Sequence, residues 1–374
     1  MKRIVFVNQA TGYLTIDIIN DYCNYYDEVV LIAGSIRVQD IPLDKKVKWQ
    51  RICLYNRGTP VKKFISWLWG SIQILFLLLL KYRKHEIFYF TIPPFSYLSS
   101  LILKRKFSIL VYDIYPDVLT IYGISSKNII YRIWSKWNKI VFNKAFRVFT
   151  ISEDMKRALS KYIDDSRIYF IPLWSGLHNI TPINKEDNSW LNRFDFSEKF
   201  IVQYSGNIGY THNVEIITTI ARCLLHEIDV HFLIIGRGER FNAIQQIIIE
   251  GNLTNVTLLP FQPDDVLNLS LAASDLSVVI QDEKVASGSL PSKIFNIQAV
   301  GNPVLGISSE SSSLNEHLAK YDIGKCFHKD QVNEIVSFIL ELKNNKSNHN
   351  QLKENSKIAS TYFTSKNATL YYSS

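Results

Sequence analysis

The sequence predicts two α/β domains, each a doubly wound parallel sheet of Rossmann type. The chain has 374 residues, a length that suits two domains of similar size. Short apolar runs alternate with longer helical patterns along the chain, and this order is typical of parallel sheets covered by helices. The alternation breaks once, after Ile171, in a stretch that contains prolines, glycine and several asparagines.

Seven strands are expected in the first half of the chain. They lie at Arg3–Asn8, Glu28–Ala33, Val47–Cys53, Ile87–Thr91, Ser108–Asp113, Arg147–Ser152 and Arg167–Ile171. Helical patterns fall between them at Thr15–Tyr25, Phe64–Leu80 and Asn128–Asn143. The residues from Pro172 onward show no clear period, so we expect a first domain at 1–172 and an interdomain connection at 173–198.

A second alternating series predicts the other domain, at 199–349. Its strands are expected at Phe200–Ser205, Val230–Gly236, Val256–Leu259, Leu276–Ile280 and Pro303–Gly306. Helices are expected at Val214–His226, Phe241–Gly251, Asp264–Ala273, Ser292–Val300, Gln331–Lys343 and Asn350–Phe363. The C-terminal helix, at about 350–374, could pack back on the first domain.

The charge of the chain is moderately positive. Its 42 Lys and Arg against 34 Asp and Glu give a formal net charge of +8. This excess suits a phosphate-bearing substrate or an anionic membrane surface. No run of basic residues with interleaved aromatics occurs, so a nucleic-acid partner is not expected.

Cysteine usage and the N-terminus both favour a cytoplasmic protein. The cysteines are Cys23, Cys53, Cys223 and Cys326, and their wide spacing forms no CxxC pair. A disulfide framework or a zinc site is therefore not expected, and the thiols should be reduced. The first residues resemble a buried strand rather than a signal peptide, because the apolar stretch is short and lacks a small-residue cleavage site.

The segment Phe64–Leu80 is almost wholly apolar and is flanked by lysines and an arginine. Its 17 residues lie at the lower limit for crossing a bilayer. Three interpretations are open: a buried core helix, a helix that lies in the membrane interface, or a transmembrane span. The last is disfavoured, because the segment lies between two expected strands of one sheet.

Glycine-rich turns follow two expected strands of the second domain. The first is Ser205–Gly209, and the second is Gly236-Arg237-Gly238. In open α/β sheets ligands bind at the carboxyl ends of the strands, and glycine lets the backbone approach a phosphate closely. Ordinary strand-to-helix turns would also use glycine here. Neither turn is the full GxGxxG fingerprint, which argues against a nicotinamide dehydrogenase.

The stretch Ser287–Leu305 is the most informative part of the sequence. A loop of small residues enters a helix with Pro291 near its start, where proline is tolerated. Lys293 follows in the first turn, a position that the helix dipole disfavours for a cation. A diphosphate bound there would explain the lysine, although a solvated lysine on a capped helix is the alternative.

The stretch from Ser289 to Leu305 resembles the signature of glycosyltransferase family 4, retaining enzymes of the GT-B fold. It is similar especially to members that build capsular polysaccharide and O-antigen by adding sugars to a lipid-linked acceptor. Further matches lie in family order at Tyr112–Asp117, Thr150–Met155, Ser205–Gly209, Phe232–Gly238 and Asn255–Pro263. The resemblance covers nearly the whole chain and implies two Rossmann-like domains that face each other across a cleft.

The resemblance also implies roles for individual residues. The catalytic residues would be Lys293, on the donor diphosphate, and Asp113, near the transferred sugar. Arg237 would lie near the nucleotide and Phe261 near the base. The donor side would comprise Gly206, Asn207, Gly209, Gly236, Arg237, Phe261, Ser289, Leu290, Pro291, Ser292 and Asn296, and the acceptor side Gln9, Thr11, Gly12 and Asp117.

Three positions depart from the family pattern. Many members carry two glutamates where this chain has Gly288 and Asn296, and the second of these bonds the ribose. Tyr210 stands where a basic residue is often found. Lys293 is therefore expected to act more alone as the counter-charge of the phosphates.

These features predict transfer, with retention, of a sugar from a UDP- or GDP-linked donor to a glycan or to a polyprenyl-diphosphate-linked acceptor. No protein nucleophile, metal or cofactor is expected, and no DxD motif follows a strand. The enzyme would be cytoplasmic and peripheral at the inner face of the plasma membrane, held there by contact with anionic lipid. The alternatives are a sugar-nucleotide epimerase, a non-catalytic membrane-associated scaffold of the same fold, and an integral membrane protein.

Overall fold

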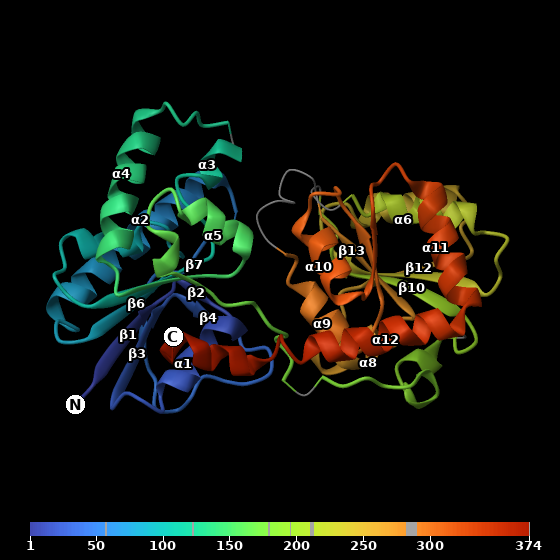
Figure 1. Ribbon diagram of the computed structural model, residues 1–374, viewed down its shortest axis with the longest axis horizontal. Coiled ribbons are helices and arrows are strands. Elements are labelled where there is room, and N and C mark those ends of the chain that lie inside the picture. Colours follow the sequence, from blue (N-terminus) through green and yellow to red (C-terminus); the bar gives the residue numbers. More distant parts are fainter. Residues whose placement is uncertain are drawn as a thin grey trace. The chain divides into compact units, whose positions relative to one another are not determined.

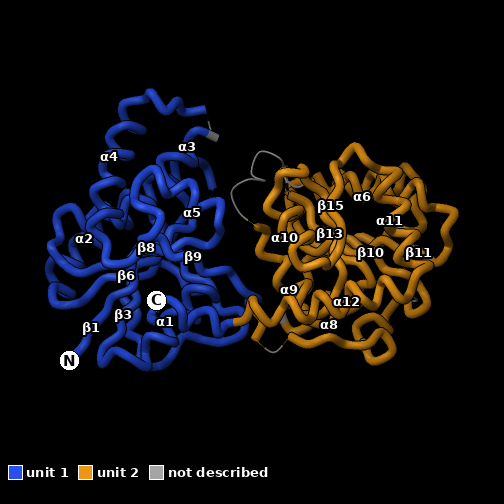
Figure 2. Tube along the Cα trace, viewed as in Figure 1, with its two compact units in different colours: residues 1–176, 365–374 blue, residues 177–364 orange. Residues whose placement is uncertain are grey.

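A computed structural model describes residues 1–56, 58–121, 123–178, 180–194, 196–209, 213–281 and 290–373 of the chain. The chain forms two compact units (Figure 2). The first comprises Met1–Gly176 with Ser365–Ser374, and the second comprises Leu177–Thr364. Both are parallel α/β domains, as the alternation of strands and helices in the sequence predicts.

In the described part of the first unit, seven parallel strands form one sheet in the order β5-β3-β1-β6-β7-β8-β9 (Figure 1). The strands are β1 Arg3–Val7, β3 Glu28–Ala33, β5 Lys48–Arg51, β6 Glu86–Phe90, β7 Phe107–Val111, β8 Arg147–Thr150 and β9 Ile168–Phe170. The helices are α1 Tyr13–Tyr22, α2 Pro60–Leu80, α3 Val118–Ile121, α4 Ile129–Lys144 and α5 Glu153–Leu159, with 3₁₀ turns at Ser96–Leu101 (η1) and Asp165–Arg167. A separate two-stranded sheet pairs β2 Ala10–Thr11 with β4 Ser35–Ile36.

Both faces of the central strands β1, β3, β6, β7 and β8 are buried, which explains why these strands are mostly apolar. On one face Val5 and Val30 pack against Ile74 of α2. On the other face Phe6 packs in the same core as Ile18 of α1.

The described part of the second unit contains a six-stranded parallel sheet in the order β12-β11-β10-β13-β14-β15. The strands are β10 Phe200–Asn207, β11 Val230–Arg237, β12 Val256–Pro260, β13 Leu276–Ile280, β14 Val304–Ile307 and β15 Gly324–Phe327. The helices are α6 Glu215–Cys223, α7 Phe241–Glu250, α8 Leu267–Ala272, α9 Lys293–Ala299, α10 Ser313–Tyr321, α11 Val332–Asn344 and α12 Lys346–Ser360, with short 3₁₀ turns at Lys185–Asp187, Leu191–Arg193 and Asp264–Val266.

Strand order reverses at one place in each sheet. In the first unit the reversal lies between β1 and β6, and in the second unit it lies between β10 and β13. Loops that leave the carboxyl ends of the two strands at such a point diverge to opposite faces and leave room for a ligand. The residues after β1 and β10 are therefore the candidate ligand-binding positions of the two units.

The last residues of the chain belong to the first unit. A 3₁₀ turn, η6 (Ser365–Thr369), and α13 (Leu370–Ser373) close the chain, and η6 packs against α1. Helix α12, which was expected to be part of the segment that packs on the first domain, lies in the second unit, where the Ser356 hydroxyl donates to the carbonyl oxygen of Asn302 at 2.7 Å. Of the expected C-terminal segment, only the final ten residues, Ser365–Ser374, belong to the first unit.

Tyr371 anchors this C-terminal segment in the core of the first unit. Its side chain is 1% exposed, its ring centroid lies 4.9 Å from that of Phe149, and its carbonyl oxygen accepts a hydrogen bond of 2.7 Å from the Tyr22 hydroxyl. Tyr371→Ala is expected to lower the stability of the first unit by about 3–5 kcal/mol, the usual cost of deleting a buried ring. Hydrogen exchange at β6 and β8 under increasing urea measures this loss. Tyr362→Ala, which removes a ring that is 59% exposed, is the control, and an equal loss in both variants would contradict the anchoring role.

Candidate functional site

The turns that leave β10 and β11 are joined into one structure. The Ile208 amide donates to the Arg237 carbonyl at 2.8 Å, and the Arg240 amide donates to the Ile208 carbonyl at 3.0 Å. A Cβ at Gly236 would collide with the carbonyl oxygen of Gly206, and a Cβ at Gly238 would collide with that of Ile208. Glycine is therefore required by the close approach of the two turns.

Lys293 lies beside these turns, at the first residue of α9. Part of its side chain is exposed, but Nζ is buried and has no hydrogen-bond partner within the described ranges. The ammonium lies 4.1 Å from the centroid of the Tyr204 ring, and the Tyr204 hydroxyl donates to the Asn207 carbonyl at 2.7 Å. A Cβ at Gly206 would collide with Nζ, so the ammonium lies directly against the backbone of the β10 turn.

Burial lowers the pKa of Lys293 from 10.5 to about 8. A cation without an anionic partner in a buried position is costly, and the ring of Tyr204 offsets only part of that cost. A phosphate oxygen in contact with Nζ would supply the missing charge and hydrogen bond. The environment of Lys293 therefore fits an anionic ligand better than the solvated lysine that the sequence left as the alternative.

Gly206 keeps the space next to the ammonium open. Gly206→Ala is expected to displace the Lys293 side chain, because the new methyl group would overlap Nζ and would lie 3.1 Å from Cε. We expect about a tenfold loss of nucleotide affinity, equal to the loss of one hydrogen bond to a charged group. Isothermal titration with a nucleoside diphosphate measures the change. Gly12→Ala adds a methyl group where nothing lies within 4 Å, so it should leave that affinity unchanged; a loss in both variants would contradict this explanation.

The other described donor-side residues lie at the ends of β10, β11 and β12 and at the start of α9 in the second unit. The guanidinium carbon of Arg237 lies 4.8 Å from the ring centroid of Phe261, and both side chains are exposed at the carboxyl ends of β11 and β12. Asn207 is exposed and its Nδ2 would lie 2.9 Å from a Cβ at Gly209. Leu290, Pro291 and Ser292 lead into α9, and Asn296 follows one turn after Lys293. Ser289, Gly288 and Tyr210 lie outside the described residues.

Gln9 and Thr11 lie at the reversal of strand order in the first unit, but their side chains point into the protein. Gln9 is fully buried and its Nε2 donates to the carbonyl oxygen of Ser66 in α2 at 2.9 Å. The hydroxyl of Thr11 donates to the carbonyl oxygen of Asn8 at 3.2 Å. Gly12, which precedes α1, has open space where a Cβ would be. Of these three, Gly12 is thus the one with free room for a ligand.

The two carboxylates after β7 differ in their surroundings. Asp113 is exposed, and its backbone amide donates to the Thr91 hydroxyl at 3.3 Å. Neighbouring protein that displaces water raises the pKa of Asp113, while the positive charge of Lys63 acts in the opposite direction. Asp117 accepts hydrogen bonds from Tyr131 at 2.5 Å and Tyr162 at 2.7 Å and forms an ion pair with Lys161. Asp117 is therefore occupied by structural contacts, whereas the Asp113 carboxylate is accessible.

Sequence reasoning did not identify two contributors to these sites, Tyr204 and Lys63. Tyr204 lies in β10, two positions before Gly206, and an aromatic residue at that position is only a weak sign of a contact with the glycine turn. Lys63 lies in the segment before the long apolar stretch, 50 positions from Asp113, and nothing in the sequence connects the two.

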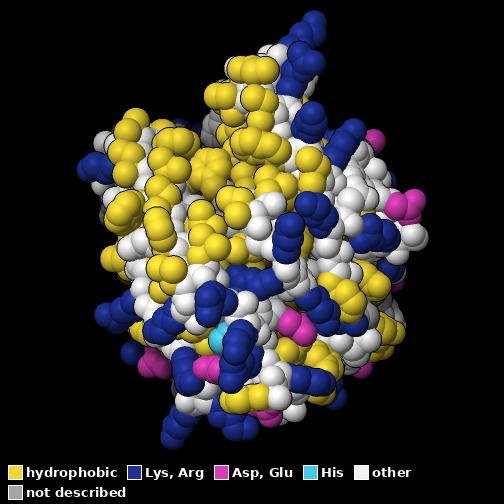
Figure 3. All heavy atoms as spheres, turned by 90° about the vertical axis from the view of Figure 1, so that its left-hand side faces the viewer, with side chains coloured by type: hydrophobic (Ala, Val, Ile, Leu, Met, Phe, Trp, Pro, Cys, Tyr) yellow, Lys and Arg dark blue, Asp and Glu magenta, His cyan; other side chains and the backbone are white. Residues whose placement is uncertain are grey.

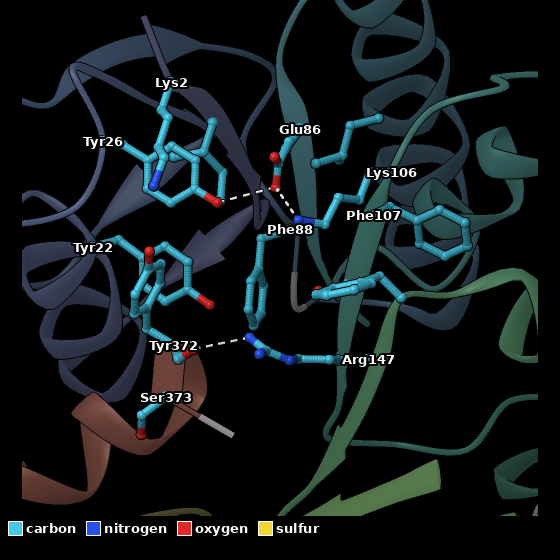
Figure 4. Close-up of a pocket in the computed structure, with 14 residues that line it drawn as sticks. Lys2, Tyr22, Tyr26, Glu86, Phe88, Lys106, Phe107, Arg147, Tyr372 and Ser373 are labelled. Atoms are coloured by element: carbon cyan, nitrogen blue, oxygen red, sulfur yellow. Dashed lines mark hydrogen bonds and ion pairs between the residues drawn. The ribbon is translucent and has the colours of Figure 1, made fainter.

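A hollow of about 370 Å³ opens at the amino-terminal ends of the strands of the first sheet (Figure 4). It lies where β1, β6, β7 and β8 begin, and Tyr372 of the C-terminal segment forms part of its wall. The Arg147 guanidinium donates to the Tyr372 carbonyl at 2.9 Å, and Lys106 pairs with Glu86 at 3.3 Å. Arg147, Lys106 and Glu86 thus have partners, and the hollow lies at the other end of the strands from Gln9, Gly12 and Asp113 of the same unit.

Part of the second unit is similar in sequence to one family of known proteins. Residues 188–359 match the family model described as glycosyl transferases group 1. WbjE of Pseudomonas aeruginosa, named as a glycosyltransferase, is 25% identical over 224 residues, which are 59% of this chain and 56% of WbjE. WcaI of Escherichia coli (strain K12), whose name assigns it to colanic acid biosynthesis, is 29% identical over 196 residues, 51% of this chain and 48% of WcaI. The chain thus spans about half the length of the curated relatives that it matches.

Solved structures extend the similarity to the whole chain. The sucrose-phosphate synthase of Thermosynechococcus elongatus superimposes with a TM-score of 0.74 at 14% identity, covering 100% of this chain and 98% of that protein. HepE of Anabaena, solved with UDP and glucose, has a TM-score of 0.70 at 14% identity, with 100% and 98% coverage. WaaG, a glycosyltransferase involved in lipopolysaccharide biosynthesis, has a TM-score of 0.70 at 13% identity, with 98% of each chain covered. The chain therefore has the fold of GT-B glycosyltransferases, and its residues 188–359 are similar to the glycosyl transferases group 1 family.

Proposed function

We propose that this protein is a glycosyltransferase that moves a sugar from a nucleoside diphosphate donor to a glycan or lipid-linked acceptor during synthesis of a bacterial surface polysaccharide. The observation that carries the proposal is the buried ammonium of Lys293, which lies against the glycine turn of β10 without a hydrogen-bond partner among the described residues. The family match of residues 188–359 and the names of the curated relatives support it. The complexes of HepE with UDP and with UDP-glucose support a uridine donor over a guanosine one.

In the proposed reaction, the bond between the anomeric carbon and the diphosphate oxygen breaks while the acceptor oxygen bonds to the same face of that carbon. Negative charge develops on the diphosphate, and Lys293 and the amides of the β10 turn stabilise that charge. The departing phosphate takes the proton of the acceptor hydroxyl. This course retains the anomeric configuration and uses no protein nucleophile and no metal.

The remaining donor residues would recognise the nucleotide. The exposed, stacked pair of Arg237 and Phe261 offers a flat surface to a base and a positive charge to a phosphate. In the first unit we assign the accessible carboxylate of Asp113 to the transferred sugar. Gly12 has the open space that an acceptor loop needs.

The proposal places the protein in the cytoplasm, peripheral to the inner face of the plasma membrane. A polyprenyl-diphosphate-linked acceptor would be presented at that face. Capsule and O-antigen synthesis are the kinds of pathway in which such an acceptor is extended.

A thermal-shift panel of UDP, GDP and their sugar conjugates tests the function. We expect stabilisation by UDP and by one or more UDP-sugars, followed by release of UDP when a matching acceptor is added. The anomeric configuration of the product, determined by NMR, tests retention. If no nucleotide stabilises the folded protein, the donor site is wrong; if a nucleotide binds but no donor is consumed with any acceptor, a non-catalytic scaffold is the better explanation.

A further inference from the structure

Helix α2 packs on the first unit along one narrow stripe. Its buried residues are Ser66, Gly70, Ile74 and Leu78, spaced four apart. Gly70 lies against the side chain of Gln9, and Ile74 and Leu78 enter the core beneath the sheet. This stripe holds α2 against the domain from Ser66 to Leu78, over more than three turns of the helix.

The rest of α2 exposes large apolar side chains. Leu68 is 46% exposed, Trp69 54%, Phe76 58% and Leu80 74%. Within the described residues α2 is long and apolar enough to cross a membrane, yet only 17% of its most apolar window is buried in the protein. The interpretation of this segment as a buried core helix is therefore wrong.

Helix α4 presents a second exposed apolar stripe. Trp134, Val141 and Phe142 face the protein, as does the buried Asn138. Ile133, Trp137 and Ile140 recur at helical spacing on another face and are 42%, 42% and 38% exposed. Ile129 and Ile130, at the start of the helix, are 64% and 62% exposed.

Aromatic contacts join the two helices into one surface. The Phe64 ring of α2 lies 5.8 Å from Phe95, which stacks on Trp134 of α4 at 4.9 Å. A second path runs from Trp67 of α2 through Tyr115 to the same Trp134, with centroid distances of 5.7 and 5.6 Å. The two helices are therefore linked through shared aromatic neighbours in the first unit, and Figure 3 shows a broad apolar area bordered by Lys and Arg on the side of the molecule that carries them.

The charged residues of α2 and α4 are all basic. No Asp or Glu occurs in the sequence between Asp44 and Glu86, the span that contains α2, or between Asp117 and Glu153, the span that contains α4. Lys62 and Lys81 flank the apolar run of α2, and Lys136 and Lys139 lie on α4 and are exposed. A cationic border around exposed Trp, Phe and Ile is the pattern of a surface that enters the headgroup region of an anionic bilayer.

We propose that α2 and α4 together form the membrane-docking surface of the protein, and that its occupant is the interface of a bilayer containing anionic phospholipid. Both helices lie flat in the interface: α2 cannot span the bilayer while its stripe from Ser66 to Leu78 is held in the core. This docking surface rests on the peripheral location in the proposed function and would hold the protein there. The observations behind it are the exposure and charge of the two helices, and they do not depend on catalysis. Helix α4 is the new element, since the sequence pointed to α2 alone.

Vesicle flotation tests the docking surface. We expect the full chain to float with vesicles of phosphatidylglycerol and phosphatidylcholine, to bind pure phosphatidylcholine more weakly, and to be released by high salt. Ile133→Gln with Trp137→Gln should weaken binding at least tenfold, because two apolar side chains lose their burial in lipid. Lys136→Glu with Lys139→Glu should weaken binding about twentyfold or more on anionic vesicles, since each lysine near such a surface contributes about fivefold.

Matched variants in the second unit serve as controls. Ile228→Gln and Ile249→Gln remove apolar residues that are 77% and 69% exposed, and they should leave flotation unchanged. Nucleotide-induced thermal stabilisation should be preserved in every variant, which separates a failure of docking from a failure of the donor site. Three outcomes overturn the proposal: an α4 variant that floats like wild type, extraction only by detergent, or a soluble dimer that the α4 variant dissociates, which would make this face an interface between copies.

Discussion

Lys293→Met is expected to raise the stability of the ligand-free protein and to reduce its stabilisation by nucleoside diphosphates. The wild-type ammonium is buried, and the shift of its pKa from 10.5 to about 8 corresponds to a penalty of about 3 kcal/mol. Methionine has a similar length and no charge, and its sulfur can contact the Tyr204 ring favourably. A residue selected for stability alone would not show this pattern, so the two effects together identify a binding group.

The pH dependence of the same variant has a defined sign. Because the folded-state pKa of Lys293 lies below its unfolded value, the unfolded chain binds the proton more tightly between pH 8 and 10.5. The cost is fully present below about pH 8 and is relieved as the pH rises toward 10.5. The stability advantage of Lys293→Met over wild type should therefore be constant below about pH 8 and should shrink above it. Denaturant unfolding across this range measures the difference, and an advantage that does not depend on pH would contradict the assignment.

The affinity for nucleotide should fall as the pH rises above about 8, whereas the stability of the ligand-free wild type should rise. A diphosphate beside Nζ favours the charged amine, so binding takes up a proton near pH 8 and affinity falls as the pH rises further. Removal of the ammonium should weaken UDP binding about 10- to 150-fold, the range for a hydrogen bond to a charged group, and should lower turnover by about 10²- to 10³-fold. Calorimetry in buffers of different ionisation enthalpy detects the proton. Lys320→Met, which removes an exposed lysine of α10, should alter none of these quantities.

The sequence predicted most of the two sheets because their central strands are buried on both faces. In continuous apolar runs such as Ile4–Val7 and Phe232–Ile235, alternate residues enter the cores on opposite faces of the sheet. A run of this length is typical of a strand that is covered on both faces. Strand β15 was missed, since Gly324 and Lys325 interrupt its apolar pattern. Strands β2 and β4 have two residues each and carry no period at all.

The donor-side residues were predicted from features of the backbone. Glycines at strand ends and a lysine in the first turn of a helix are unusual in themselves, and the structure brings Gly206 and Lys293 into contact. The first unit is different, because any polar side chain after a strand can serve either a ligand or the fold. Gln9 donates to a residue 57 positions away and Asp117 accepts from one 45 positions away. Only the tertiary structure reveals such partners.

Asp113→Asn is expected to lower turnover by about 10²-fold or more while leaving the affinity for UDP unchanged. The carboxylate is exposed at the end of β7, and the substitution keeps the shape of the side chain while removing its charge. A charged group that acts on the reacting sugar contributes to the rate, whereas the nucleotide is held by residues of the second unit. The loss should therefore appear in kcat, with the KM for the donor sugar nucleotide little changed.

The pH profile separates a catalytic carboxylate from a structural one. Because the pKa of Asp113 is raised, wild-type turnover should increase with pH as this group ionises, at a higher pH than an ordinary aspartate would give. That acidic limb should be absent in Asp113→Asn. Asp27→Asn, at the opposite edge of the same sheet, keeps the limb and the rate, because its carboxylate is exposed and bonds the amide of Lys2. An unchanged profile in Asp113→Asn, with its rate reduced, would mean that the side chain only supports the loop after β7, and the charge that acts on the sugar would then have to come from another residue.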